Sequence, residues 1–325
     1  MAATRNKRSI DLPGRVGDFI ATRLAPAERV CVGLSGGCDS VVLLHLLSRL
    51  GLGARLSAIH VHHGLSPNAD DWAAFCAAYC RQLAVALDIA HVEVDRQSGL
   101  GLEAAARQAR YAVLANCDAD SLLLAHHQGD QAETVLFNLL RGAGVAGAAG
   151  MPVERPLGAR RLLRPLLAFS RAEIEDYARQ QGLAWIDDES NIDLHYSRNF
   201  LRHEILPRLS ARFPQAEASL TLAASHFGET DQLLAELAAV DWQKVQESDG
   251  QTASLHAMRA LSLSRLKNLL RYRLRELGWR TPVASRLEEF ARQLQSAAPD
   301  RHPELQLPEG CLRIAQGRVH WLVQK

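Results

Sequence analysis

The segment from Val30 to Leu47, VCVGLSGGCDSVVLLHLL, limits most strongly what this chain can fold into. A short valine-rich run leads into a turn that contains Gly36 and Gly37, and a longer apolar run follows it. This order predicts a buried strand, a tight turn and a buried helix. Two glycines let the backbone approach an anion closely, and the N-terminus of the helix adds partial positive charge. The segment therefore predicts a phosphate-binding loop in an α/β fold.

The same alternation of short apolar runs and helical patterns continues along the chain. We expect strands at 29–34, 56–61, 90–94 and 121–125, and helices at 38–50, 69–86, 102–117 and 130–140. A strand near 161–163 precedes a helix that Ser170 and Glu173 open as a capping box. Strands that alternate with helices predict a doubly wound, Rossmann-like parallel sheet with helices on both faces.

The chain beyond this pattern has a different organisation. Pro207 and Pro214 mark a break, and a long helical stretch follows at 216–240. A basic helix at 263–277 and short strands near the end indicate a second, smaller, mostly helical α+β domain. We therefore expect a catalytic domain at 1–214, and a helical linker with a nucleic-acid-binding domain at 215–325.

Composition excludes several classes of protein. With 47% hydrophobic and 22% charged residues, the chain has the make-up of an ordinary globular protein, and no apolar run is long enough to span a membrane. Neither a secretory signal nor a CxxC pair occurs, so we expect a cytoplasmic protein whose six cysteines do not form a disulfide scaffold. Cys76 and Cys80 stand four apart in a helical pattern and indicate buried thiols more than a metal or redox pair. The sequence leaves the oligomeric state open, a homodimer included.

The polar residues of the glycine turn point to a nucleotide with its metal ion. Ser35 and Ser40 supply hydroxyl groups, and Asp39 is a carboxylate beside expected phosphates. A carboxylate is useful there when it holds Mg²⁺, which neutralises both groups. The turn is not a Walker loop, because no GK[ST] follows the glycines.

A second polar cluster follows the fourth expected strand. His126, His127, Asp130 and Glu133 lie where that strand ends and the next helix begins. In a strand order such as 3-2-1-4-5, strands 1 and 4 flank the point where the order reverses, so both clusters open into one crevice. The acidic pair Asp130 and Glu133 suits a cationic amine, although Glu133 alone also fits a simple helix start.

Ser35–Ser40, SGGCDS, matches the pyrophosphate loop of the N-type ATP pyrophosphatases. Together with a series of ordered motifs, it resembles the tRNA(Ile)-lysidine synthase family over roughly residues 29–207. These motifs are HVHHGLS at 60–66, GLEAAARQARYAVL at 101–114, AHHQGDQAET at 125–134, RGAG at 141–144, RPLL at 164–167 and DDESNIDLHYSRNFLRHEILP at 187–207.

The resemblance implies a reaction and a set of residues. ATP activates the wobble cytidine of the isoleucine tRNA with a CAU anticodon, pyrophosphate leaves, and free lysine then displaces AMP. It implies ATP binding by the loop residues Ser35, Gly36, Gly37, Cys38, Asp39 and Ser40. His62 ends the second expected strand near the same crevice, so we expect it to contact the nucleotide, with a structural role as the alternative. Asp39 is the expected Mg²⁺ ligand, and Asp130 and Glu133 are the expected lysine ligands; these three are the expected catalytic residues. Expected tRNA contacts are Arg110, Arg198, Asn199 and Arg202.

One position departs from the family pattern, which usually has two adjacent aspartates before the glutamine. Here the first of them is Gly129. Either the lost carboxylate weakens metal or lysine binding, or the glycine serves a tight turn before the helix.

Two other functions compete with this interpretation. A tRNA thiolase uses the same adenylation, but it needs a catalytic cysteine or an iron–sulfur cluster, and the cysteine spacing offers neither. A degenerate tRNA-binding protein is the other alternative, and only Gly129 favours it. The helix at 263–277 and its flanks carry a set of basic residues that either grips the RNA backbone or forms a solvated face: Arg259, Arg265, Lys267, Arg271, Arg273, Arg275 and Arg280.

Overall fold

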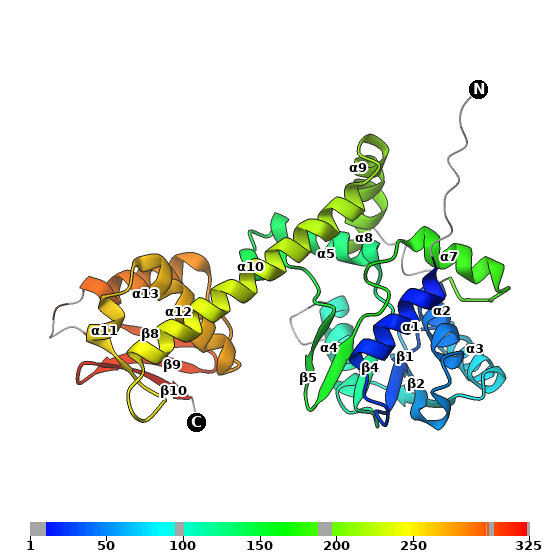
Figure 1. Ribbon diagram of the computed structural model, residues 1–325, viewed down its shortest axis with the longest axis horizontal. Coiled ribbons are helices and arrows are strands. Elements are labelled where there is room, and N and C mark those ends of the chain that lie inside the picture. Colours follow the sequence, from blue (N-terminus) through cyan, green and yellow to red (C-terminus); the bar gives the residue numbers. More distant parts are fainter. Residues whose placement is uncertain (1–10, 95–100, 188–196, 297, 299–301, 324–325) are drawn as a thin grey trace. The chain divides into compact units, whose positions relative to one another are not determined.

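The computed structural model describes residues 11–94, 101–187, 197–296, 298 and 302–323, without the side chains of Leu102 and Glu103. The chain forms two compact units, Met1–Gly228 and Glu229–Lys325 (Figure 1). The boundary between them falls within one long helix, α10 (Ala216–Val245). Each unit has its own hydrophobic core.

The N-terminal unit is built on a six-stranded sheet of order β3-β2-β1-β4-β6-β5 (Figure 1). Its strands are β1 (Val30–Gly33), β2 (Leu56–His62), β3 (Ala86–His91), β4 (Ser121–Leu123), β5 (Glu154–Leu157) and β6 (Arg160–Leu163). All neighbours are parallel except β5, which forms an antiparallel hairpin with β6. The doubly wound parallel sheet is therefore confirmed, and β1 and β4 flank the reversal of strand order.

Helices cover the sheet on both faces. The helices of this unit are α1 (Leu12–Arg23), α2 (Cys38–Ser48), α3 (Ala69–Gln82), α4 (Leu102–Leu114), α5 (Gln128–Leu140), α6 (Val145–Ala148), α7 (Arg171–Gln180), α8 (Ser197–Phe200) and α9 (Leu206–Arg212). A 3₁₀ turn at Gly53–Arg55 and a π-helical turn at Leu201–Ile205 complete it.

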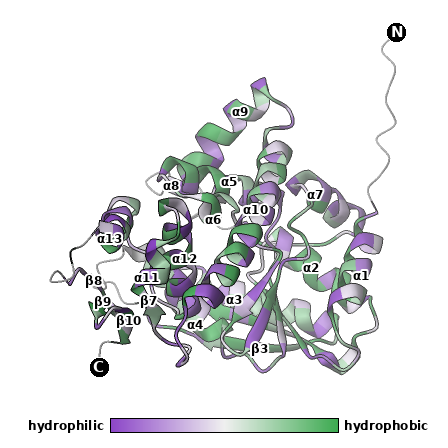
Figure 2. Ribbon diagram, turned by 60° about the vertical axis from the view of Figure 1, so that its left-hand side comes forward, coloured by the Kyte–Doolittle hydropathy of each residue, from purple (hydrophilic) through white to green (hydrophobic). Residues whose placement is uncertain are grey.

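Alternation along β1 divides the core into two layers. Val30 and Val32 pack in one cluster with residues of α1, α2 and α7, whereas Cys31 packs in another cluster with Leu114 of α4. Successive strand residues point to opposite faces, so a strand that is apolar throughout must be covered on both. Figure 2 shows α2 coloured mostly hydrophobic, in agreement with its burial against the sheet.

Two expectations about local structure were wrong. The third strand was expected at 90–94 but runs from Ala86 to His91, because the preceding helix ends at Gln82 and Ala84 takes a left-handed conformation (φ 52°) that turns the chain early. Pro207 does not break a helix. It stands in the first turn of α9, directly after the π-helical turn Leu201–Ile205, so helical structure continues across it. Pro214 does separate α9 from α10.

The capping box at Ser170 is confirmed. The Ser170 hydroxyl accepts from the Glu173 N–H, and the Glu173 carboxylate accepts from the Ser170 N–H, at the start of α7. This fixes where α7 begins, and so where its first residue, Arg171, is placed.

The C-terminal unit packs helices on a four-stranded antiparallel sheet of order β7-β10-β9-β8. Its elements are β7 (Ala253–Ser254), α11 (Leu255–Arg259), α12 (Leu263–Glu276), α13 (Ala284–Ser296), β8 (Glu304–Leu307), β9 (Gly310–Ala315) and β10 (Arg318–Val323). The smaller α+β domain is thereby confirmed. Among the described residues of both units, no helix is long and apolar enough to cross a membrane.

Candidate functional site

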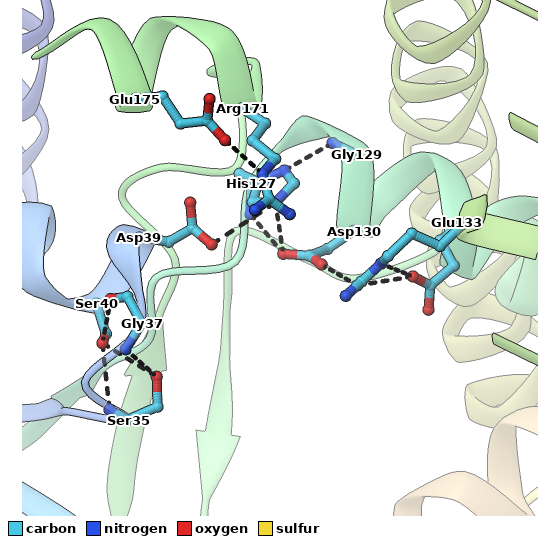
Figure 3. A network of polar contacts seen from close by, with 11 residues as sticks. Ser35, Gly37, Asp39, Ser40, His127, Gly129, Asp130, Glu133, Arg171 and Glu175 are labelled. Atoms are coloured by element: carbon cyan, nitrogen blue, oxygen red, sulfur yellow. Dashed lines mark hydrogen bonds and ion pairs between the residues drawn. The ribbon is translucent and has the colours of Figure 1, made fainter. Parts of the chain in front are cut away.

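The glycine turn between β1 and α2 folds back on itself through its two serines. The Ser40 hydroxyl donates to the Gly37 carbonyl (2.9 Å), and its oxygen accepts from the Ser35 N–H (3.2 Å). The Gly37 N–H in turn donates to the Ser35 hydroxyl at 3.3 Å (Figure 3). These bonds hold the loop in a fixed shape at the N-terminus of α2, as an anion-binding loop requires.

Gly36 allows this loop for two separate reasons. Its φ is +89°, a conformation that residues with a side chain rarely adopt. A Cβ atom there would also lie 2.8 Å from Ile186 Cδ1 and 3.3 Å from Cys76 Sγ. The glycine therefore serves both the turn and the close packing of the segment at Ile186.

Asp39, in the first turn of α2, points toward the second polar cluster. Its Oδ2 lies 3.8 Å from Nε2 of His127 (Figure 3). Its Oδ1 is buried and has no hydrogen-bond partner in the described part of the chain. Burial raises the pKa of Asp39 above its ordinary value, and the nearby charge of His127 opposes this. A buried oxygen without a partner is energetically costly unless a ligand or a water molecule binds it.

His127 connects the two clusters and caps α5. Its Nδ1 accepts from the Gly129 N–H at 3.0 Å, so the ring proton sits on Nε2. That Nε2–H group lies between Asp39 and Asp130, 3.8 Å and 3.6 Å from their nearest oxygens (Figure 3). The sequence placed His127 near the site without giving it a role. The available signal was its position before Asp130, where a helix cap is expected.

The structure also explains Gly129. Its φ is not in the left-handed region, and it lies inside the first turn of α5, so the tight-turn explanation was wrong. A Cβ atom at this position would lie 2.8 Å from Cε1 and 3.1 Å from Nδ1 of His127. The ring of His127 occupies the space that a side chain at position 129 would need.

The acidic pair meets two arginines. Glu133, 2% exposed, lies 3.2 Å from Arg198 and 2.8 Å from Arg202, and Asp130 lies 2.9 Å from Arg202. Burial raises the pKa of Glu133 against the opposing effect of the arginines. Burial also acts to raise the pKa of Asp130, but the neighbouring His127 and Arg202 lower it overall. The two carboxylates therefore differ, and Glu133 is the better proton acceptor.

These groups surround a cavity of about 400 Å³ at the carboxyl ends of β1, β2 and β4. Of the residues expected at the site, the cavity is lined by Ser35, Gly37, Cys38, Asp39, Ser40, His62, Arg110, Asp130 and Arg202. Gly36, Glu133, Arg198 and Asn199 do not line it. Asn199 lies on α8, and Glu133 and Arg198 stand behind Asp130 and Arg202. Part of the expected RNA-contacting motif, residues 188–196, lies outside the described residues.

Several lining residues were not expected. His60 is buried and its Nδ1 donates to the Leu34 carbonyl (2.9 Å), which ties β2 to the start of the loop. Arg171 pairs with Glu175 at 2.8 Å on α7 and projects toward the cavity (Figure 3). Sequence gave no signal for Arg171, because its place depends on how α7 packs against α2.

Comparison with known proteins agrees with this geometry. Residues 12–209 match the PP-loop domain family, and residues 254–320 match the TilS substrate binding domain. The chain is 47% identical over 294 residues to a tRNA(Ile)-lysidine synthase from Aromatoleum aromaticum, covering 90% of this chain and 68% of the relative. It is 43% identical to the enzyme of that name from Nitrosomonas europaea, covering 99% of this chain and 71% of the relative.

A solved structure shares the fold at lower identity. It is a U34-tRNA thiolase from Methanococcus maripaludis with its [4Fe-4S] cluster. The TM-score is 0.58 at 19% sequence identity, over 67% of this chain and 78% of that one. At this identity the likeness shows the fold alone.

Proposed function

The chain belongs to the family of tRNA(Ile)-lysidine synthases, and we propose that it joins free lysine to the wobble cytidine of the isoleucine tRNA with a CAU anticodon. In the reaction that we propose, the C2 oxygen of the cytidine attacks the α-phosphate of ATP, and pyrophosphate leaves. The amine of lysine then attacks C2, and AMP leaves with the C2 oxygen. One observation carries the proposal: the glycine loop and Asp130, which shares Arg202 with Glu133, open into one cavity.

The glycine loop suits the phosphates of ATP. We propose that the backbone of Ser35, Gly36 and Gly37, the N-terminus of α2 and the Ser40 hydroxyl bind them, with Cys38 as the first helical residue. His62, whose Nε2 lies 2.9 Å from Asp70, lines the cavity at the end of β2 and would contact the nucleotide.

Asp39 fits a magnesium ion that arrives with ATP. Its buried, unpartnered oxygen is the type of ligand that Mg²⁺ prefers. Among the described residues no group of three or more acidic, histidine or cysteine side chains forms a metal cage. A single carboxylate is consistent with Mg²⁺, which usually takes its other ligands from water and phosphates. When bound, the ion would neutralise negative charge on the phosphates.

The arrangement of Asp130, Glu133, Arg198 and Arg202 suits a free amino acid. Lysine carries an ammonium group at each end and one carboxylate, so acidic and guanidinium groups placed side by side can bind both signs. We propose that the carboxylates hold the attacking amine and that Glu133, with its raised pKa, accepts the proton that the amine must lose.

The RNA would enter from the side of Arg110, Arg198, Asn199 and Arg202. We propose residues 1–214 as the catalytic part, and residues 215–325 as a linker and a tRNA-binding part. A cytoplasmic location is part of this proposal, since tRNA and ATP are found there. The thiolase alternative fails on the cysteines: the described ones are free, and all but Cys311 are buried.

Labelled lysine tests the proposed function. The chain is incubated with ATP, Mg²⁺, labelled lysine and the unmodified isoleucine tRNA, and label in the RNA is measured together with AMP and pyrophosphate. The expected result is one AMP and one pyrophosphate for each lysine incorporated. Methionine tRNA, which shares the anticodon before modification, is the control. Release of pyrophosphate without incorporation of lysine would contradict the proposal.

A further inference from the structure

Arginines gather around Tyr111, beside the cavity. Arg107 and Arg110 come from α4, and Arg155 comes from the antiparallel strand β5 (Figure 1). Their guanidinium carbons lie 4.9, 5.8 and 5.4 Å from the centre of the Tyr111 ring. Nη2 of Arg107 also reaches the Tyr111 hydroxyl at 3.5 Å. One phenol ring therefore organises cations from two separate elements.

A fourth arginine belongs to the same cluster and is buried. Arg164 follows β6 directly and is only 3% exposed. It donates to the Pro152 carbonyl (2.6 Å) and to Nδ1 of His126 (3.2 Å). Neither partner carries a negative charge. Burial lowers the pKa of His126 to about 3, so this histidine is neutral, and because Nδ1 accepts, its Nε2 carries a proton.

Within the part of the chain that the structure describes, no acidic side chain balances the charge of this cluster. Among the described side chains, no carboxylate forms an ion pair with Arg107, Arg110, Arg155 or Arg164. The positive field is visible at Tyr111: burial acts to raise its pKa, but the charges of these arginines lower it overall. The positive charges of neighbouring arginines repel each other, and a buried cation without a counter-ion is unfavourable. A bound anion would relieve both effects.

We propose that Arg107, Arg110, Arg155 and Arg164 form a binding site for backbone phosphates of the RNA chain next to the nucleotide held in the cavity. The site rests on the proposed function. Arg110 and His126 also line the cavity, so the cluster continues its wall. Arg110 is exposed and Arg107 and Arg155 are half-buried, so a chain can pass over them. Arginines on separate elements of the fold can contact successive phosphates of an RNA chain, whereas one small anion would reach fewer of them.

The test measures the salt dependence of tRNA binding. Arg155→Gln and, as a second variant on another element, Arg107→Gln are compared with the wild-type full chain across salt concentrations. Each lost phosphate contact is expected to lower the slope of log Kd against log salt concentration by about one unit. The KM for tRNA rises and the KM for ATP stays the same. Arg155→Lys keeps the charge and is expected to keep the slope.

Arg179→Gln is the matched control, since Arg179 is an exposed arginine of the same unit that already pairs with Glu175 and Asp176. Its slope should equal that of the wild type. An unchanged slope in both Arg155→Gln and Arg107→Gln, with normal wild-type binding, overturns the phosphate site alone. The two variants can also be less inhibited by added pyrophosphate while the salt slope of tRNA binding stays unchanged. That result overturns the RNA phosphate site too, because the ligand of the cluster is then free pyrophosphate. A wild-type chain that does not bind the tRNA overturns the proposed function itself.

Discussion

Arginine is frequent in both units of the molecule, and its partners differ between them. In the N-terminal unit Arg198 and Arg202 pair with the buried carboxylate of Glu133, and the arginines around Tyr111 have no acidic partner among the described side chains. In the C-terminal unit the basic helix α12 is largely neutralised from within. Arg265 pairs with Asp241, and Lys267 pairs with Glu288 at 2.8 Å.

The comparison shows that many charged residues in one segment do not necessarily leave charge available to a partner. Basic residues are dense in the sequence at 263–277. Several of them form ion pairs with carboxylates of the same unit, so less positive charge is left to bind a partner. At the carboxyl ends of the parallel strands, burial raises the pKa of Asp39, and its Oδ1 has no hydrogen-bond partner among the described residues, which is common for groups at functional sites. Position in the fold, more than local composition, therefore identifies the functional charges.

The largest effect is expected from Asp39→Asn. If Asp39 holds Mg²⁺ against the phosphates, loss of its charge should lower tRNA-dependent ATP–pyrophosphate exchange by on the order of 10²–10³-fold, while tRNA binding survives. The matched change in the C-terminal unit is Asp231→Asn, a carboxylate that pairs with Arg275. It should leave exchange unchanged. Normal exchange in Asp39→Asn would remove the metal role.

Glu133→Gln should act on lysine. A lost charge-assisted hydrogen bond costs about 1.5–3 kcal/mol, so we expect the KM for lysine to rise roughly ten- to a hundredfold, with little change in the KM for ATP. Glu288→Gln is the control, because Glu288 also pairs with two cations but lies in the other unit. If ATP binding weakens and the KM for lysine does not move, the acidic pair belongs to the metal site.

Gly129→Ala tests whether the ring of His127 needs the empty space beside it. A Cβ atom would displace the ring, so we expect exchange to fall about tenfold, the low end for loss of a group that positions a ligand. Gly228 is the control: it lies within α10, where a Cβ meets nothing within 4 Å.

Stability provides a second measurement on the same pair of variants. Alanine in a helix stabilises by about 0.5–1 kcal/mol relative to glycine, so Gly228→Ala should raise the Tm by a few degrees. Gly129→Ala should not raise the Tm, because it displaces the His127 ring that caps α5, and a lost helix cap costs about 1 kcal/mol. An equal rise in Tm with full activity in both variants would show that the His127 ring is free to move.

Much of the fold and the place of the site follow from the sequence, for a physical reason. Apolar runs predict buried strands, and parallel strands bring their carboxyl ends to one edge, so the SGGCDS and AHHQGDQAET loops had to meet. The third strand was placed too late, because an edge strand is only partly buried and its pattern is weak. Strand β5, which supplies Arg155 and forms a hairpin with the expected strand β6, was missed.

The contacts within the site could not be predicted in this way. Arg198 and Arg202 are 65 and 69 residues distant from Glu133 along the chain, and no local pattern states that they pair with it. The tautomer of His127 depends on one hydrogen bond from Gly129, which a sequence does not contain. Spacing therefore locates residue types at an edge of the sheet, and side-chain packing decides which of them meet.

The smallest expected effect is a difference in tRNA binding between two neighbouring arginines of α12. Arg271 and Arg275 are one helical turn apart, and the sequence predicts that they contact tRNA as a pair on one face. In the structure Arg275 pairs with Asp231 at 2.9 Å, whereas Arg271 has no ion pair with a described residue. We therefore expect Arg271→Ala to lower the salt slope of tRNA binding by about one unit, and Arg275→Ala to change it less. Asp231→Asn frees Arg275, so Arg275→Ala made in that background should lower the slope as much as Arg271→Ala does. If none of these variants alters the slope or the turnover at saturating tRNA, α12 is a solvated face, and the RNA is held by the N-terminal unit.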